Sequence, residues 1–208
     1  MQLCAIICEY NPLHLGHAWQ IEQAKRRFGS VVCIMSGSFV QRGEPALLPK
    51  SDRVRAALAG GVDLVLELPL PWALSSAEHF AFGAVSLLDA LGCVGILSFG
   101  SECGDLDALT RVADTLDSPR FSSLLRYHLD MGIAFPEARQ RAVREIAGEK
   151  TAALLESPNN TLGIEYIKAL RALRSPMIPY PVARFGAGHA DVDRPLGNIA
   201  SATYLRTL

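Results

Sequence analysis

The amino-acid sequence predicts an α/β fold: a five-stranded, mostly parallel sheet with a helical insertion before its last strand. Short apolar runs alternate along the chain with longer amphipathic segments, as in folds that pass from strand to helix to strand. Within the runs, apolar residues do not alternate with polar ones, which is typical of parallel strands buried on both faces. The runs comprise residues 3–8, 31–35, 62–66, 94–99 and 177–183.

Each element has its expected place. We expect the run at 3–8 at the centre of the sheet, with the run at 94–99 beside it. Right-handed crossovers through helices at 17–28, 51–59 and 75–91 would join the first four runs. The fifth run is the least regular, because Pro179 and Pro181 interrupt it. The predicted insertion comprises helices at 105–116, 121–131, 135–147 and 162–173. No linker divides the chain, so residues 1–208 are read as one domain.

Composition limits the class of protein. Half of the 208 residues are hydrophobic and 20% are charged, which indicates a globular chain with a substantial core. The net charge of −1 does not fit a stand-alone nucleic-acid-binding domain, which would be clearly basic. A small anionic ligand needs only a few local cations and backbone N–H groups, so this class stays open.

Cysteines and hydropathy bear on the compartment. The five cysteines are odd in number and form no CxxC pair, so we interpret them as mostly buried free thiols of a cytoplasmic protein rather than as disulfides or a zinc site. The N-terminus lacks the basic region of a signal peptide. No stretch of 18 apolar residues is uninterrupted, so we expect no membrane association.

The strongest chemical signal is the segment at residues 9–17, which reads EYNPLHLGH and follows the first run. In open α/β sheets, ligands bind at the carboxyl edge of the strands, where a helix start offers N–H groups to an anion. His14 and His17, three positions apart, can point the same way at a helix start and donate to phosphate oxygens. Gly16 would let a base or a phosphate approach the backbone closely.

These residues carry a resemblance. The segment at 14–17 resembles the HxGH signature of the nucleotidyltransferase superfamily, and 9–17 resembles the EYNPFHxGH segment of bacterial tRNA(Met) cytidine acetate ligases. Residues 35–46, MSGSFVQRGEPA, are similar to that family's MSGNFxQRGEPA. Three more segments agree in order along the chain, at 61–69, 99–102 and 157–166.

The resemblance implies a Rossmann-like HxGH nucleotidyltransferase fold and a reaction. The family activates acetate with ATP to acetyl-adenylate and then acetylates N4 of the wobble cytidine of elongator tRNA(Met). It implies ATP as cofactor, with Mg²⁺ as a partner of the ATP phosphates and no dedicated carboxylate cage for the metal. The resemblance implies a further C-terminal domain beyond these 208 residues, which are expected to be either a truncated form or a short relative, so we expect tRNA(Met) binding by them alone to be weak.

Site residues follow from placement and resemblance together. His14 and His17 are the predicted catalytic residues. Asn160 is favoured over Asn159, although the Asn pair before a helix is also explained by capping. The predicted nucleotide-binding residues are Ile7, Glu9, Tyr10, Asn11, Gly16, Gln20, Gly100, Ser101, Asn160, Arg184, Ser201, Thr203 and Arg206.

An acceptor pocket is predicted after the second run. It comprises Ser36, Gly37, Arg42 and Lys50, and no residue is assigned to acetate. Lys50 and Arg53 open the second helix, and the simpler interpretation makes both of them surface charges.

Two other functions stay open. One is an adenylyltransferase that acts on another small acceptor, which would share ATP and the histidines. The other is a non-catalytic ATP-binding module, which would bind ATP without turnover. The presence of both His14 and His17 favours an enzyme.

Overall fold

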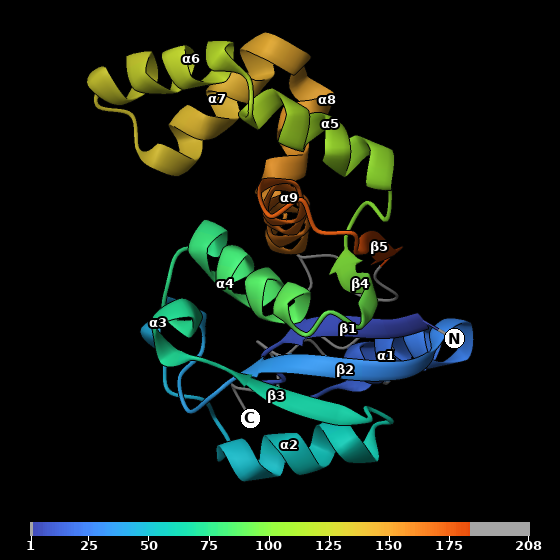
Figure 1. The fold of residues 1–208 in the computed structure, drawn as a ribbon. Coiled ribbons are helices and arrows are strands. Elements are labelled where there is room, and N and C mark those ends of the chain that lie inside the picture. The colour runs from blue at the N-terminus through green and yellow to red at the C-terminus, as the bar shows by residue number, and fades with distance from the viewer. Residues whose placement is uncertain (1, 184–208) are drawn as a thin grey trace.

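Five parallel strands form the sheet in the computed structural model, which describes residues 2–183 (Figure 1). Their order is β3-β2-β1-β4-β5, so the first strand lies at the centre and the fourth beside it, as predicted. Every neighbouring pair is parallel, which is stricter than the mostly parallel sheet expected. The strands are β1 (Gln2–Cys8), β2 (Gly29–Ser36), β3 (Leu64–Leu68), β4 (Val94–Ser101) and β5 (Ile178–Ala183).

The predicted start of the third strand is wrong by two residues, since β3 begins at Leu64 rather than at Val62. The residues before β3 form a turn that is held by contacts of the Asp63 side chain. Gly61 has a φ of +104°, and the Asp63 carboxylate accepts the backbone N–H of Val31 at 2.8 Å and pairs with Lys25. The apolar run alone does not separate this turn from the strand.

The two prolines of the last strand are explained by its position. Among the described strands, β5 pairs only with β4 and so forms one edge of the sheet. At an edge, alternate N–H groups point away from the ladder, so Pro179 and Pro181 can occupy alternate positions without losing a ladder hydrogen bond.

Alternate residues of the central strands face two separate cores. Ala5 and Ile7 of β1 pack in one cluster with α4 (Ala77–Ala90) and α9 (Pro158–Ala172). Cys4, Ile6 and Cys8 pack in the other, with α1 (Leu15–Phe28) and α2 (Lys50–Ala59). This burial on both faces is the reason why the strands read as continuous apolar runs. The short elements α3 (Leu70–Ala73) and η1 (Gln41–Gly43) follow β3 and β2 respectively.

The predicted helical insertion is confirmed and forms a lobe beyond the sheet (Figure 1). Its last helix begins at Pro158, four residues earlier than expected, with Pro158 in the first turn, where its missing N–H costs nothing. Asn159 and Asn160 therefore lie inside this first turn and not before the helix. The lobe comprises α5 (Leu106–Leu116), α6 (Pro119–Asp130), α7 (Phe135–Ala147), α8 (Glu149–Ala152) and η2 (Ala153–Glu156), and leads into α9.

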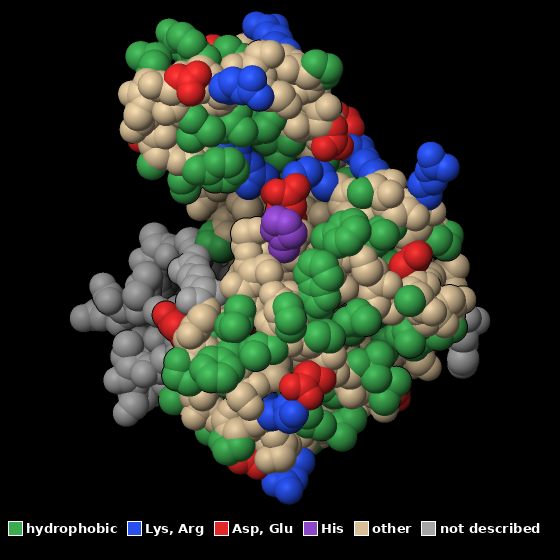
Figure 2. Space-filling model, turned by 60° about the vertical axis from the view of Figure 1, so that its left-hand side comes forward, with side chains coloured by type: hydrophobic (Ala, Val, Ile, Leu, Met, Phe, Trp, Pro, Cys, Tyr) green, Lys and Arg blue, Asp and Glu red, His purple; other side chains and the backbone are tan. Residues whose placement is uncertain are grey.

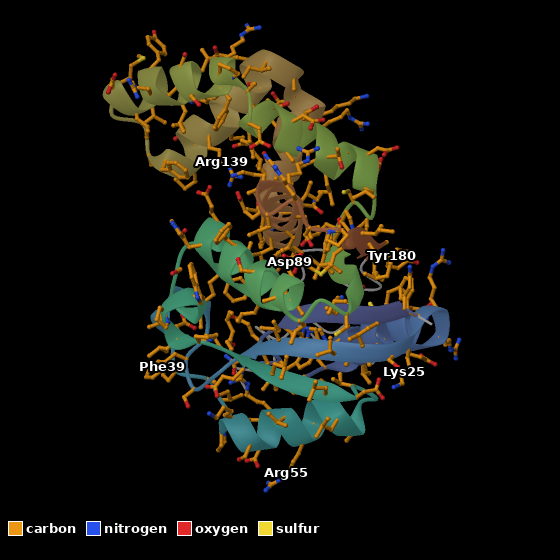
Figure 3. All side chains as sticks on the ribbon, viewed as in Figure 1. Lys25, Phe39, Arg55, Asp89, Arg139 and Tyr180 are labelled. Atoms are coloured by element: carbon orange, nitrogen blue, oxygen red, sulfur yellow. The ribbon has the colours of Figure 1, made fainter. Side chains whose placement is uncertain are left out.

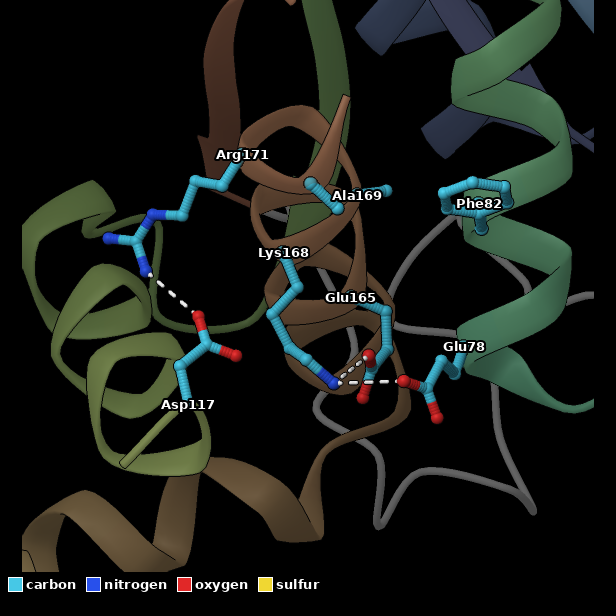
Figure 4. A pocket seen from close by; sticks show the side chains of 8 residues that line it. Glu78, Phe82, Asp117, Glu165, Lys168, Ala169 and Arg171 are labelled. Atoms are coloured by element: carbon cyan, nitrogen blue, oxygen red, sulfur yellow. Dashed lines mark hydrogen bonds and ion pairs between the residues drawn. The ribbon is translucent and has the colours of Figure 1, made fainter. Parts of the chain in front are cut away.

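Ion pairs on α9 tie the lobe to the helices on the sheet. Arg139 of α7 reaches the buried carboxylate of Glu165, which also accepts from Lys168 at 2.9 Å (Figure 3). Lys168 bridges to Glu78 of α4, and Arg171 pairs with Asp117 (Figure 4). Except for Arg139, these side chains line a groove of about 470 Å³, and its charges are paired with one another.

Two further expectations concern the burial of the cysteines and membrane-spanning helices. Cys4, Cys8 and Cys33 are buried free thiols, as expected, whereas Cys93 is exposed and Cys103 is half-buried. Within the described part of the chain, no helix is both long and apolar enough to cross a membrane.

Candidate active site

The segment between β1 and α1 forms a tight turn at the carboxyl edge of the sheet. Tyr10 is buried and has a φ of +44°, in the left-handed region that non-glycine residues rarely adopt. The Asn11–Pro12 peptide bond is cis. A left-handed conformation at a non-glycine residue such as Tyr10 is typical of functional sites, where the surroundings hold it in place.

The two histidines come together at the end of this turn. Their ring centroids lie 3.7 Å apart with 26° between the planes, so the predicted common direction is confirmed. The helix begins earlier than expected, at Leu15, and His14 is its N-cap. His14 Nδ1 accepts the N–H of Gly16 at 3.1 Å, and His17 Nδ1 accepts the N–H of His14 at 3.4 Å.

These bonds select a tautomer. A neutral imidazole whose Nδ1 accepts a hydrogen bond carries its proton on Nε2. Both His14 and His17 are therefore set up as Nε2–H donors, beside the positive end of the α1 dipole. Two such donors at a helix start suit the charge that grows on a phosphate during substitution at phosphorus.

Gly16 has a role within the protein itself. A side chain at this position would bring its Cβ to 3.0 Å from Cε1 of His14, closer than the ring can accommodate without shifting. The glycine thus makes room for the capping imidazole. Its predicted approach to a nucleotide stays a prediction.

The Tyr10 side chain lies against the ring of His17. Its ring lies 5.0 Å from that of His17, and its hydroxyl bonds with the Cys33 thiol at 3.4 Å. Burial, together with the nearby Cys8, raises the pKa of Tyr10 well above its usual range, so the phenol stays neutral. The side chain is part of the core.

Side chains of the turn also hold the loop that follows β2. Glu9 accepts the N–H of Gln41 at 2.6 Å, and Asn11 accepts the N–H of Leu47 at 2.7 Å. The loop is further closed by a bridge between Phe39 and Pro45. The loop after β2, which contains predicted acceptor residues, is therefore held against the turn between β1 and α1.

Lys50 lies at the surface, and its place in the acceptor pocket stays a prediction, whereas the surface-charge interpretation is wrong for Arg53. Lys50 is exposed and pairs with Glu67 at 2.7 Å. Arg53 is 1% exposed, and its guanidinium donates to the carbonyls of Glu9, Ser36 and Gly37. The reason is geometric: Arg53 lies on the inner face of α2, one turn before the buried Ala57.

A second cluster joins β4 to the start of α9. The Oδ1 atom of buried Asn160 accepts from the Ser101 hydroxyl at 2.7 Å and from the N–H groups of Glu102 and Cys103. In return, the Glu102 carboxylate accepts the N–H of Asn160 at 2.9 Å and the Asn159 amide at 2.6 Å. Glu102 so caps a helix whose own N-cap residue forms no side-chain bond.

Comparison with known proteins identifies the family of the chain. A model described as HIGH Nucleotidyl Transferase matches residues 1–208, the whole chain. The chain belongs to the HIGH nucleotidyl transferase family.

Longer relatives resemble this family member closely. A tRNA(Met) cytidine acetate ligase of Caldanaerobacter subterraneus is 44% identical over 99% of this chain and 52% of its own length. One of Syntrophotalea carbinolica is 47% identical over 99% of this chain and 50% of its own length. The chain thus spans about half the length of the curated relatives it matches.

Two crystal structures of Thermotoga maritima TmcAL share the fold. The apo form superimposes with a TM-score of 0.92 at 38% identity, over 100% of this chain and 51% of that one. The form bound with alpha-thio ATP gives a TM-score of 0.89 at 37% identity, over 100% and 50% of the two chains.

The remaining predicted residues of this nucleotidyl transferase are placed as follows. Ile7 lies near the end of β1, Gln20 in the second turn of α1, and Gly100 near the end of β4. Arg42 lies in η1. Four predictions lie outside the described residues, those for Arg184, Ser201, Thr203 and Arg206. The sequence prediction named the segments that hold Glu67 and Glu102 but included neither carboxylate, and it weighed Arg53 only as a charge at the start of a helix.

Proposed function

We propose that this chain activates acetate with ATP to form acetyl-adenylate, as the nucleotidyl-transfer part of a tRNA(Met) cytidine acetate ligase. The observation that carries the proposal is the stacked pair His14 and His17, both set as Nε2–H donors at the start of α1. The names of the 44–47% identical relatives support acetate and tRNA(Met) as substrates. The TmcAL structure bound with alpha-thio ATP supports ATP as the nucleotide.

In the first step, an acetate oxygen attacks the α-phosphorus of ATP. The bond from that phosphorus to the bridging oxygen breaks, and pyrophosphate leaves with the electron pair. His14 and His17 donate to the oxygens on which negative charge increases, so they stabilise the transition state more than bound ATP. Of the predicted nucleotide-binding residues that the structure describes, Gly100, Ser101 and Asn160 lie on the β4 side of β1.

Mg²⁺ is proposed only as a partner of the phosphates. Among residues 2–183, no group of three or more His, Cys, Asp or Glu side chains forms a metal site. Mg²⁺ commonly keeps several waters and binds through substrate phosphates, so ATP itself would supply most of its ligands. No step is assigned to the ion.

In the second step, N4 of the wobble cytidine attacks the acetyl carbonyl carbon, AMP leaves, and the amine loses a proton. We assign this step to the longer protein, with tRNA(Met) as partner. On the face seen in Figure 2, Lys and Arg side chains lie among Asp and Glu and form no continuous basic stripe. Binding of tRNA depends on clustered phosphate contacts, which this part of the surface does not offer.

The test is ATP–pyrophosphate exchange with and without acetate. We expect exchange that depends on acetate. Exchange with a different acceptor alone would favour another adenylyltransferase of the same family. ATP binding without exchange under any condition would leave a nucleotide-binding module and reject the proposal.

A further inference from the structure

Arg53 is a buried cation that joins two loops at the carboxyl edge of the sheet. Its Nε and one terminal nitrogen donate to the Glu9 carbonyl, and the same terminal nitrogen reaches the Ser36 carbonyl at 2.9 Å and its hydroxyl at 3.2 Å. The other terminal nitrogen donates to the Gly37 carbonyl. One planar group thus satisfies three main-chain acceptors from two loops.

The arrangement is specific to arginine. Guanidinium has five donors in a fixed planar fork, whereas the ammonium of lysine is a single point of donation. Burial of a cation is costly unless it is compensated, and here the hydrogen-bond partners within the described residues are carbonyls and one hydroxyl, with the nearby charge of Glu9 as a further favourable interaction. A purely apolar residue would pack at this position at a lower cost, but it would leave the carbonyls without donors.

The Glu67 side chain lies beside the loop after β2. A Cβ on Gly37 would meet the Glu67 carboxylate, whose second oxygen pairs with Lys50 at 2.7 Å, so the glycine leaves room for this side chain. The carbonyls of Ser36 and Gly37 are held from the Arg53 side. Small changes in the Arg53 side chain would move this loop relative to the turn at Glu9.

Most of the predicted nucleotide side is held without Arg53, whose contact with it is the main-chain carbonyl of Glu9 and leaves the Glu9 side chain to the loop after β2. The histidines are held by the backbone of α1, and Ser101 is held by Asn160, with Arg53 in neither set of bonds. The strand order places β4 on one side of β1 and β2 on the other. Arg53 therefore acts on the β2 side, where the predicted acceptor pocket lies.

We propose that Arg53 is a positioning residue that sets the spacing between the Glu9 turn and the Ser36–Gly37 loop, and thereby determines use of the carboxylic acid acceptor rather than binding of ATP. The inference rests on the proposed function, since it needs acetate as the attacking acid. Misplacement of a reacting group by about 1 Å can cost on the order of 100-fold in rate.

The experiment compares Arg53→Lys with Arg55→Gln in the full chain. Arg55 lies on the same helix but points into solvent, where it pairs only with Asp52 among the described residues (Figure 3). Both variants are measured for ATP affinity by calorimetry and for ATP–pyrophosphate exchange against acetate and against propionate. Thermal unfolding establishes that each variant is folded.

For Arg53→Lys we expect an acetate KM raised by roughly tenfold or more, a higher propionate-to-acetate ratio of kcat/KM, and an ATP Kd within about twofold of the parent. Arg55→Gln should match the parent in all three. A parental acetate KM and acid selectivity in Arg53→Lys would overturn the inference, and so would an equal loss of ATP affinity, which indicates general disruption.

A second variant covers the case in which Arg53→Lys does not fold. Arg53→Gln places no charge in the buried position and keeps an amide donor, but it lacks the planar fork that spans the two loops. We expect the same rise in acetate KM at unchanged ATP Kd, and a parental KM would contradict the proposal. If the parent chain itself shows no acetate-dependent exchange, the proposed function fails, which is a different outcome from a parent that exchanges and variants that behave like it.

Discussion

The Ser101 hydroxyl donates to Asn160 Oδ1 at 2.7 Å, across 59 positions of sequence, and so fastens the end of β4 to the first turn of α9. Two further donors, the N–H groups of Glu102 and Cys103, share the same amide oxygen. One buried acceptor thus organises the loop between Gly100 and α5, in which nucleotide contacts are predicted.

Asn160→Ala should destabilise the protein and weaken ATP binding. It leaves three donors without their acceptor, of which the Ser101 hydroxyl is buried and the two N–H groups are part-buried, and an unsatisfied buried group costs about 1–3 kcal/mol. For a chain of this size, each 1 kcal/mol lowers the melting temperature by about 2–4 °C. The measurement is thermal unfolding with and without ATP.

Asn159→Ala is the matched control for that change. Asn159 donates to Glu102, but the carboxylate keeps the N–H of Asn160, so a smaller loss of stability is expected. Equal losses in the two variants would show that the Asn160 oxygen has no special role in holding the loop.

His17→Ala should abolish adenylate formation while ATP still binds. A donor aimed at charge that develops in the transition state contributes to rate more than to affinity, and loss of one such donor typically costs about 100- to 1,000-fold in rate. Pyrophosphate exchange gives the rate and calorimetry gives the Kd. Near-parental exchange would remove His17 from catalysis, and a loss confined to ATP affinity would make it a ground-state ligand.

The sequence was enough to predict those parts of the fold and site that depend on local chemistry. Burial of β1 on both faces produces its apolar run, and the short loop after β1 brings His14 and His17 to one helix start. The spacing of the two histidines is set by the helix itself, so their proximity was predictable.

The missed residues depend on contacts between distant segments. Arg53 is buried because carbonyls of two other loops converge on it, and a charged residue near a helix start is otherwise typical of a solvated position. A local signal did exist, since Arg53 and Ala57 share one face of α2. Glu102 caps α9 through Asn159 and Asn160, which lie 57 and 58 positions further along the chain. No pattern in the segment around Glu102 indicates this contact.

The stability of the fold should decrease as pH rises above about 9. Burial raises the pKa of Cys4 to about 12 from an ordinary value of 9.0, so above pH 9 the unfolded chain loses this proton before the folded chain does. The folded state then binds more protons, and the free energy of unfolding falls with pH. Below pH 9, both states keep the proton and the effect vanishes.

Urea unfolding at pH 8, 9 and 10 measures this decline. Cys4→Ala should make it shallower, while buried Cys8 and Tyr10, whose pKa values are also raised, keep part of it. Cys93→Ala, at an exposed thiol, should leave it as in the parent. An unchanged decline in Cys4→Ala would argue against burial of this thiol.

The last prediction concerns tRNA: the 208-residue chain should bind ATP but bind tRNA(Met) weakly even at low salt. Two stretches are basic in the sequence, at 25–27 and 139–144, and in the structure their cations are engaged. Lys25 pairs with Asp63, Arg26 with Glu22, and Arg27 lies 5.3 Å from the ring centre of Tyr180. On α7 the pairs are Arg139 with Glu165, Arg141 with Glu137, and Arg144 with Glu149.

Filter binding with tRNA(Met) over a salt series, beside calorimetry with ATP, tests this last point. A double variant, Glu137→Gln with Glu149→Gln, provides the comparison, because it releases Arg141 and Arg144 from exposed carboxylates and should strengthen binding at low salt. Each additional phosphate bound by a released arginine should steepen the slope of log K against log salt by about 0.7–0.9. Tight, salt-sensitive binding by the parent chain would place tRNA recognition within this part of the protein, and absence of ATP binding would remove the basis of the functional proposal.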